Sequence, residues 1–125
     1  MHAEERQLRI ALLAYRGKLN EIAVSMCEFN GALYIGSGIV NGGYHRLAKV
    51  GPAAGEIIRI YPDDSWELVI GNQRLTLDGL KFPLRHMGPG FDNFFNGYIW
   101  RMFVHEGTMY AGTFKWTVLM PFIPL

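Results

Sequence analysis

The chain has 125 residues, of which 50% are hydrophobic and 18% charged, and its net charge at neutral pH is +1. This length fits one domain, and this much apolar material can form a core, so the composition argues against a disordered chain. The near-neutral charge excludes a strongly basic nucleic-acid-binding protein. With Cys27 as the single cysteine, no internal disulfide can form. Glycine accounts for 15 residues, well above the usual ~7%, which is typical of a β-rich chain with many tight turns.

The N-terminal segment lacks the features of a signal peptide. Glu4 and Glu5 come first, and Arg6 and Arg9 interrupt the apolar residues that follow. A secretory signal needs a positive start and then an unbroken apolar run. No apolar stretch approaches the ~20 residues of a membrane span. We therefore expect a soluble cytoplasmic protein with no membrane partner, although a chain cut from a longer secreted parent would have the same pattern.

Residues 3–16 are the first candidate element, and their pattern is ambiguous. Leu8, Leu12 and Tyr15 recur at helical spacing, which slightly favours a short helix. A strand over residues 7–13 is the alternative, because apolar residues there also alternate with polar or small ones.

Residues 21–72 predict a four-stranded antiparallel meander. The Asn-Gly pair at 30–31 separates two apolar runs, and this pair is the strongest short signal for a hairpin. Turn-forming residues at 62–65 (PDDS) separate the two alternating segments of a second hairpin. The glycine-rich stretch 38–55 joins the two hairpins.

A long connection and a third hairpin complete the pattern. Glycines and prolines interrupt residues 73–97, which argues against regular structure there. Loops of this length are uncommon in compact domains and often functional. Strands at 98–105 and 108–113 then flank a Glu-Gly turn.

The first and third hairpins share the frame N-x5-M-x4-G-x2-Y-x-G-[ST], seen when residues 20–37 are aligned with 96–113. The first glycine makes the turn, and the second lets backbones approach closely. A repeat at fixed period indicates units that bury their faces against each other. We therefore expect Tyr34 and Tyr110 to occupy equivalent strand positions.

Two runs of sequence resemble the blades of a group of uncharacterised bacterial β-propeller proteins. Residues 88–114 (GPGFDNFFNGYIWRMFVHEGTMYAGTF) are similar to a blade junction with the pattern G-F-x-N-[PF]-F-N-x-Y-x-W-R-M followed by a G-x-[LM]-Y-x-G-T hairpin. Residues 51–71 are similar to the outer half of such a blade, and the resemblance covers roughly residues 20–120. Phe94 stands where the pattern favours proline. The resemblance implies an all-β, propeller-blade-like fold and no particular reaction.

The length of the chain makes such a fold incomplete on its own. A propeller has ~4–8 blades of ~40–50 residues, and residues 1–125, taken as a single domain, hold about one and a half. The chain then associates with further copies, packs its own termini over the exposed face, or is a fragment of a larger propeller. We expect a homo-oligomer, with a two-fold dimer as the commonest arrangement. Five apolar residues in the terminal segments are candidates for the interface: Leu12, Tyr15, Phe122, Ile123 and Leu125.

Five residues are candidates for a ligand-binding site. His45 and Arg46 lie in the first long loop, and Asp92, Asn96 and Arg101 crowd a junction rich in aromatic residues. An arginine can bind a carboxylate or phosphate through two hydrogen bonds, and aromatic rings often wall ligand pockets. The structural alternative is that asparagine and aspartate satisfy loop backbone while the aromatic rings fill space. Asn20 holds the place of Asn96 in the first hairpin, and a residue that recurs in both hairpins favours the structural alternative.

The remaining reactive residues fit structural roles. Asp63 and Asp64 are adjacent, which is typical of a turn and not of shared metal ligands. The histidines lack metal-ligand spacing, and neither a nucleophile elbow nor a phosphate-binding loop is present. Cys27 fits a small core residue, and Trp66 and Trp100 are expected to be buried. The sequence therefore predicts no metal and no cofactor, and it assigns no catalytic residue.

We expect a non-enzymatic, propeller-like structural or binding module that acts through self-assembly. The alternative is an enzyme or a small-ligand-binding propeller whose site lies in the loops 38–55 and 73–97. No nucleic-acid partner is expected, and the sequence names no small-molecule ligand.

Overall fold

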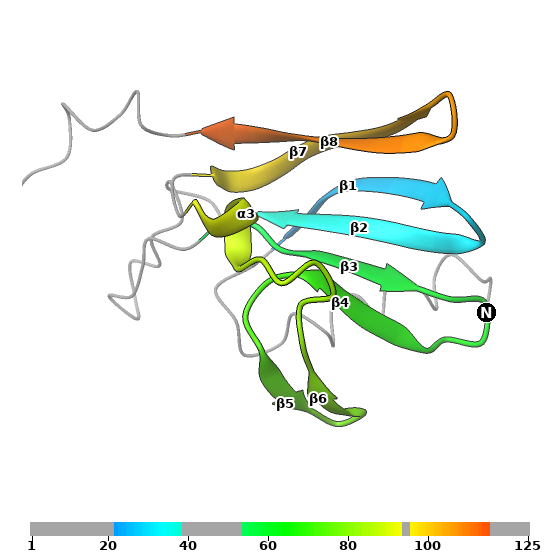
Figure 1. Ribbon diagram of the computed structural model, residues 1–125, viewed down its shortest axis with the longest axis vertical. Helices are drawn as coiled ribbons and strands as arrows, with labels where there is room; N and C mark the ends of the chain where they lie inside the picture. Colours follow the sequence, from blue (N-terminus) through cyan, green and yellow to red (C-terminus); the bar gives the residue numbers. More distant parts are fainter. Residues whose placement is uncertain (1–21, 39–53, 94–95, 116–125) are drawn as a thin grey trace, which may run out of the picture.

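The computed structural model describes residues 22–38, 54–93 and 96–115. These residues form mostly antiparallel β-sheet, which confirms the all-β class (Figure 1). The helix or strand expected within residues 3–16 and the apolar C-terminal tail lie outside the described residues. No helix in the described ranges is long and apolar enough to cross a membrane.

The expected four-stranded meander is present. Its strands pair antiparallel in chain order: β1 (Ile22–Phe29), β2 (Ala32–Gly38), β3 (Ile57–Ile60) and β4 (Trp66–Ile70). The β1–β2 turn is made by Asn30 and Gly31, whose φ angles of 49° and 79° fit the hairpin turn that the Asn-Gly pair predicts.

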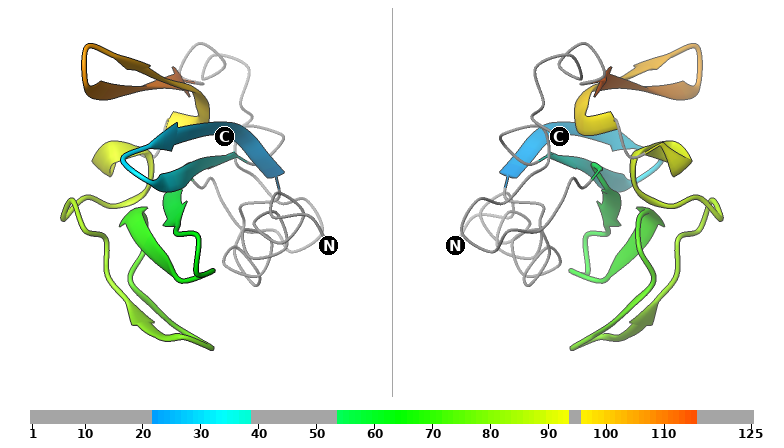
Figure 2. Two further views of the ribbon diagram at one scale, coloured as in Figure 1. Left: turned by 90° about the vertical axis from the view of Figure 1, so that its right-hand side faces the viewer. Right: turned by 90° about the vertical axis from the view of Figure 1, so that its left-hand side faces the viewer.

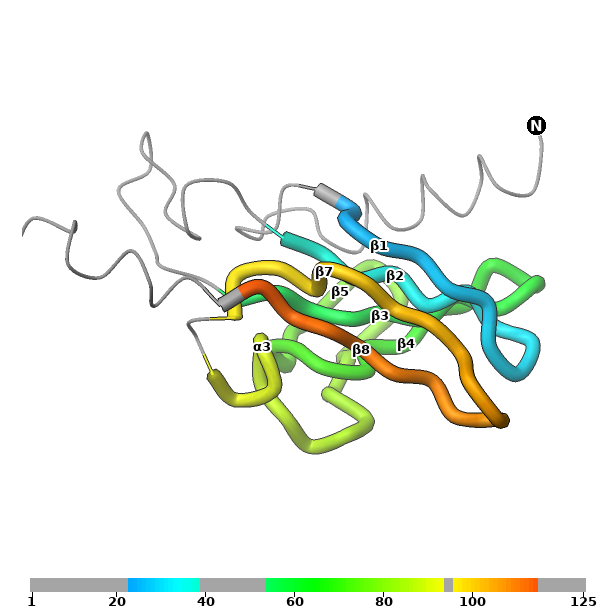
Figure 3. The backbone as a smooth tube through the Cα atoms, turned by 90° about the horizontal axis from the view of Figure 1, so that it is seen from above, coloured from blue at the N-terminus to red at the C-terminus, as the bar shows by residue number. Residues whose placement is uncertain are grey.

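The third hairpin, β7 (Asn96–His105) and β8 (Thr108–Lys115), is also present. It joins the meander through one residue pair, Gly38 with Tyr98, and beyond this pair it leaves the plane of the meander and packs against one of its faces (Figure 2). The turns β1–β2, β3–β4 and β7–β8 all lie at the same end of the molecule (Figure 3). Within the described residues, β8 is the last strand of the sheet, and its only partner strand is β7.

The two similar hairpins have the same register, which confirms the expected equivalence of Tyr34 and Tyr110. Tyr34 pairs with Cys27 in the first hairpin, and Tyr110 pairs with Phe103 in the second. Each first strand carries a β-bulge at the matching place, between residues 23 and 25 and between residues 99 and 101. The second turn repeats the first, because Glu106 and Gly107 have φ angles of 48° and 75°.

A close approach between the hairpins explains one glycine of the shared frame. A Cβ atom at Gly36 would lie 2.6 Å from Ile99 Cβ, too near for any larger residue. The hydroxyl group of Ser25 donates a hydrogen bond to Ile99 O at 2.7 Å, which fixes β7 at this place. The missing side chain of Gly36 therefore makes room for a residue of the next hairpin.

The meander buries apolar side chains on both faces, because successive strand residues point to opposite sides. One cluster consists of Ile35, Ile58, Ile60, Trp66 and Leu68. The other cluster includes Tyr34, Ile57 and Val69 of the meander together with Ile99 and Met102 of β7. The inner face of the hairpin β7–β8 thus covers one face of the meander.

A buried ion pair ties the start of β3 to the segment after β4. The Glu56 carboxylate accepts hydrogen bonds from Asn72 N at 2.7 Å and from the Arg74 guanidinium at 2.9 Å. The side chains of Glu56 and Arg74 are both nearly inaccessible to solvent. A buried charge of this kind needs its partner, so the pair holds the two segments in one arrangement.

The prediction of an irregular connection over residues 73–97 was wrong in part. This connection contains a small hairpin and one helical turn: β5 (Arg74–Thr76), β6 (Gly79–Lys81) and α3 (Pro89–Asp92). Leu77 and Asp78 form the two-residue turn of the hairpin, Gly79 follows with a positive φ of 102°, and Trp66 holds the hairpin in place. The indole N–H of Trp66 donates to Asp78 Oδ2 at 2.8 Å, and Lys81 Nζ lies 4.7 Å from the centre of the Trp66 ring.

The prediction that both tryptophans are buried was correct for Trp66 and wrong for Trp100. Trp66 is 4% exposed, whereas Trp100 is 60% exposed. Trp100 lies at the β-bulge of β7, where the extra residue disturbs the alternation of faces. Ile99 is the residue that turns into the core at this place, and Trp100 points away from it.

Candidate functional site

The structure describes three of the five predicted ligand-binding residues. Asp92 lies at the end of α3, Asn96 at the start of β7, and Arg101 just after the bulge in β7. His45 and Arg46 lie outside the described residues.

Asp92 and Asn96 bond to the backbone around α3. Asp92 Oδ1 accepts the amide of Gly88 at 2.6 Å, and Asn96 Nδ2 donates to Gly90 O at 2.9 Å. Gly90 also donates its amide to Gly55 O at 2.7 Å, so this junction is attached to the start of β3. Both side chains therefore do what the structural alternative expects, which is to satisfy loop backbone.

Arg101 is exposed on β7, away from this junction. Within the described residues, no hydrogen bond or ion pair joins Asp92, Asn96 and Arg101 to one another. A ligand-binding role for the five residues stays a prediction. Among the described residues, no three His, Cys, Asp or Glu side chains lie close enough together to bind a metal ion.

The adjacent aspartates form a turn, as the sequence suggests. Asp63 Oδ1 accepts hydrogen bonds from both the hydroxyl group and the amide of Ser65. These two bonds lower the pKa of Asp63 below its ordinary value, because they stabilise the charged carboxylate.

A cavity of about 430 Å³ lies between the meander and the tip of β7–β8. Its lining combines apolar side chains with two arginines and a tyrosine: Phe29, Tyr34, Arg59, Val69, Leu84, Arg85, Gly107, Thr108 and Met109. The lining contains no acidic residue. Segments from both hairpins of the shared frame therefore meet around one space.

Arg59 is already engaged at the edge of this cavity. Its Nε donates to Glu67 Oε2 at 2.6 Å, and its Nη1 donates to the hydroxyl oxygen of Tyr34 at 3.2 Å. Burial lowers the pKa of Arg59, but the hydrogen bonds with Tyr34 and Glu67 outweigh it and raise the pKa above the ordinary value. Arg85 is exposed, and its side chain has no hydrogen-bond or ion-pair partner among the described residues.

Sequence reasoning missed this cavity because its residues come from five different strands and two connecting segments. One signal was available in the sequence. Arg59 lies in the apolar segment 57–61 (IIRIY), where a charged side chain requires a hydrogen-bonding or oppositely charged partner. The register supplies the neighbours, because Arg59 pairs across the strands with Tyr34 on one side and Glu67 on the other.

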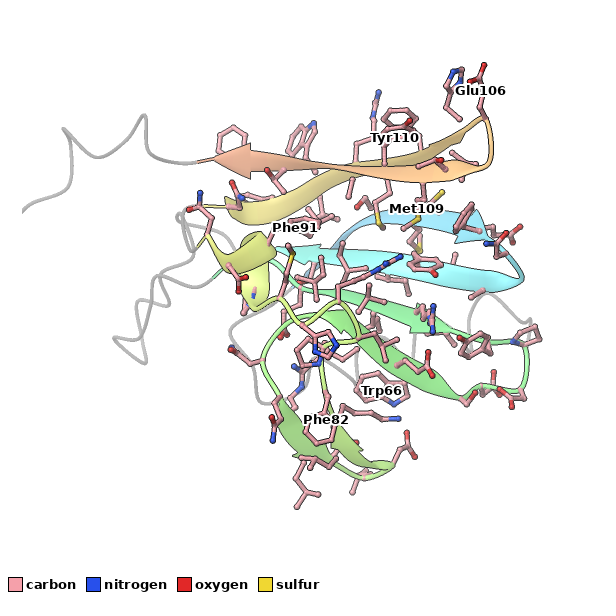
Figure 4. All side chains as sticks on the ribbon, in the orientation of Figure 1. Trp66, Phe82, Phe91, Glu106, Met109 and Tyr110 are labelled. Carbon is pink, nitrogen blue, oxygen red and sulfur yellow. The ribbon has the colours of Figure 1, made fainter. Side chains whose placement is uncertain are left out.

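The outer side of β7–β8 carries a cluster of aromatic rings, which we call the outer aromatic face: Tyr98, Trp100, Phe103, Tyr110 and Phe114. The rings contact each other in two groups. Phe103 and Tyr110 stack with their ring centroids 5.3 Å apart. The ring centroids of Tyr98, Trp100 and Phe114 lie within 6.4 Å of one another. Figure 4 shows Tyr110 pointing away from the rest of the molecule while Met109 points toward it.

The equivalent position in the first hairpin is covered. Tyr34 is 8% exposed because β7–β8 packs over it, whereas Tyr110 is 48% exposed. The same position of the frame is therefore buried in one hairpin and open in the other. Exposed aromatic rings gathered on one face are typical of a surface that binds a partner.

Comparisons with protein-family models, curated proteins and solved structures find no match to this chain. The resemblance to propeller blades accordingly rests on the sequence motifs.

Proposed function

We propose that this protein is a non-enzymatic, propeller-blade-like structural or binding module that acts through self-assembly. The observation that carries the proposal is the contrast between Tyr34 and Tyr110, which hold the same place in two hairpins of the same register. One is buried beneath the next hairpin and the other is 48% exposed. The bonds of Asp92 and Asn96 to loop backbone support a structural role for these two residues.

The size of the outer aromatic face supports association. Four rings of this face are about half exposed: Trp100, Phe103, Tyr110 and Phe114. Because an aromatic side chain has roughly 200 Å² of surface, these four leave on the order of 400 Å² of apolar surface open to water. A patch of this size lies within the range of the largest patches on monomeric proteins, which are often functional. Covering it stabilises an assembly through the hydrophobic effect.

Light scattering over a range of protein concentrations tests the proposal. We expect a molar mass above 14.2 kDa that falls toward this value on dilution. The double variant Tyr110→Ser/Phe114→Ser should have the monomer mass at concentrations where the wild type is associated. The control is Leu77→Ser, which removes an even more exposed apolar side chain from the β5–β6 turn and should leave the mass unchanged. A wild-type mass of 14.2 kDa at every concentration would contradict self-assembly.

A second candidate function is the binding of a small anion in the 430 Å³ cavity, to which Leu84 and Arg85 of the second long loop contribute. Arg85 supplies a charge without a partner among the described residues, next to apolar walls. An aromatic carboxylate such as benzoate matches both features. Titration with benzoate should show saturable binding that Arg85→Gln weakens at least tenfold. Equal binding by the variant would remove Arg85 from the site.

A further inference from the structure

Within the described residues the outer edge of β8 is free, and its backbone groups follow a defined pattern. In a hairpin with a two-residue turn, the residues that flank the turn form a hydrogen-bonded pair, and such pairs alternate along the strands. His105 and Thr108 flank the turn, so Tyr110 and Gly112 also direct their backbone groups toward β7. The N–H and C=O groups of the alternate residues 109, 111 and 113 then point away from β7.

The first hairpin shows what covers this edge when a strand is present. The matching residues of β2 are 33, 35 and 37, and they pair with β3, as Leu33 does with Ile60 and Ile35 with Ile58. The amide of Ser37 donates to Glu56 O at 2.9 Å. In the hairpin of identical register, the corresponding edge accepts an antiparallel strand.

Over residues 108–114, the edge of β8 lacks the features that protect exposed strands in the part of the chain that the structure describes. Natural proteins guard such edges with lysine, proline, bulges or a covering segment. Residues 108–114 (TMYAGTF) contain no charged residue and no proline. The register of β8 has no shift between residues 101 and 105 of its partner, so the strand is regular there. This edge is therefore suited to pairing with another strand.

Gly112 is a second, independent indication of a partner. Its equivalent, Gly36, must be glycine because Ile99 occupies the space where a Cβ would lie. At Gly112, the nearest atom to an added Cβ is Arg101 O at 3.7 Å, which is ordinary contact, and the φ angle is not positive. Nothing in the described chain therefore requires glycine at this exposed strand position, but a partner side chain packed over it would.

We propose that a second copy of this chain adds its own β8 to this edge, antiparallel and about a two-fold axis at Ala111. Residue 111 then faces residue 111 of the second copy, and residue 109 faces residue 113. Tyr110 of each copy lies opposite Gly112 of the other, where the missing side chain leaves room for the ring. This register pairs the whole of residues 108–114, whereas centring the axis on Met109 would leave the end of the strand unpaired. The two outer aromatic faces join into one surface of a four-stranded sheet.

This inference rests on the proposed self-assembly, and engineered cysteines separate the two. All variants carry Cys27→Ala, so that no native thiol is present. At the two-fold axis, the Cα atoms of residue 111 are about 5.5 Å apart, which suits a disulfide. The Cα atoms of residue 113 in the two copies are roughly 13 Å apart along the strands, too far for one.

The experiment follows disulfide formation by non-reducing electrophoresis under a glutathione redox buffer. Ala111→Cys should form a covalent dimer at least tenfold faster than Thr113→Cys. An equimolar mixture of Met109→Cys and Thr113→Cys should form a mixed dimer, whereas neither alone should. Thiol titration in denaturant confirms that each variant has one reactive cysteine, and thermal unfolding confirms that each is folded.

Two failures have different meanings. If the wild type associates but Ala111→Cys forms disulfides no faster than Thr113→Cys, the β8 pairing is wrong and the proposed self-assembly stands. If the wild type has a mass of 14.2 kDa throughout, both are wrong.

Discussion

At the scale of single residues, the two tryptophans differ in how much they contribute to the free energy of unfolding. Trp66 is buried between the meander and the β5–β6 hairpin, and its ring contacts Lys81 while its N–H is bonded to Asp78. Trp100 has the same size but lies on the exposed side of β7. Burial and not residue type sets the contribution to stability.

Trp66→Ala should lower the free energy of unfolding by about 3–5 kcal/mol, the usual cost of deleting a large buried side chain. Trp100→Ala should lower it by less than about 1 kcal/mol, because most of that ring is already in water. Urea denaturation at low protein concentration measures both. Similar losses for the two variants would mean that Trp100 is packed in the monomer.

The turn at Asp63 makes a prediction about pH. Because hydrogen bonds from Ser65 lower the pKa of Asp63, Ser65→Ala should raise that pKa toward the ordinary value. A lowered pKa in the folded state stabilises the fold above the unfolded-state pKa, and this contribution is lost as the pH falls through the lowered value. An NMR titration of the Asp63 carboxyl carbon in both proteins tests this, and an unchanged pKa in the variant would contradict it.

At the scale of elements, the first hairpin and β7–β8 are two versions of one unit. They share register, bulge and turn, but among the described residues β2 has a further strand, β3, on its outer edge and β8 has none. The difference lies in what surrounds them. Equivalent substitutions in the two hairpins should therefore have unequal effects.

Gly36→Ala should destabilise the protein by about 1–3 kcal/mol, because its Cβ would clash with Ile99. Gly112→Ala, at the equivalent position, should be neutral or stabilise the monomer by less than about 1 kcal/mol, since the added methyl group has ordinary contacts and the unfolded chain loses freedom. Thermal unfolding of the monomer compares them. Equal destabilisation would show that β7–β8 is as closely covered as β1–β2.

The sequence predicted the elements with strong local signals and missed those that depend on distant contacts. The Asn-Gly turn and the alternation beside it were enough for β1 and β2. The β5–β6 hairpin was missed although Asp78 and Gly79 are residues that favour turns, because its strands are only three residues long and depend on Trp66. Likewise, the cavity arginines could not be placed together without the strand register that joins Arg59 to Tyr34.

At the scale of the whole molecule, β7 covers one face of the meander, whereas the outer side of the hairpin β7–β8 is exposed. Ile99 and Met102 fill the interface between β7 and the meander, while the outer aromatic face is exposed and β8 has no further strand on its edge among the described residues. An unprotected edge beside an apolar surface favours association over an isolated monomer. We therefore expect a second copy of the chain to cover the edge of β8.

Amide hydrogen exchange, measured residue by residue at low and high protein concentration, tests this claim most directly. The amides of Tyr110 and Gly112 face β7 and should be protected at both concentrations. The amides of Met109, Ala111 and Thr113 should exchange rapidly in dilute protein and become at least tenfold slower in concentrated protein, as they gain partners across the new strand pair. If these three amides exchange at the same rapid rate at both concentrations, the β8 edge remains open to water and the account is wrong.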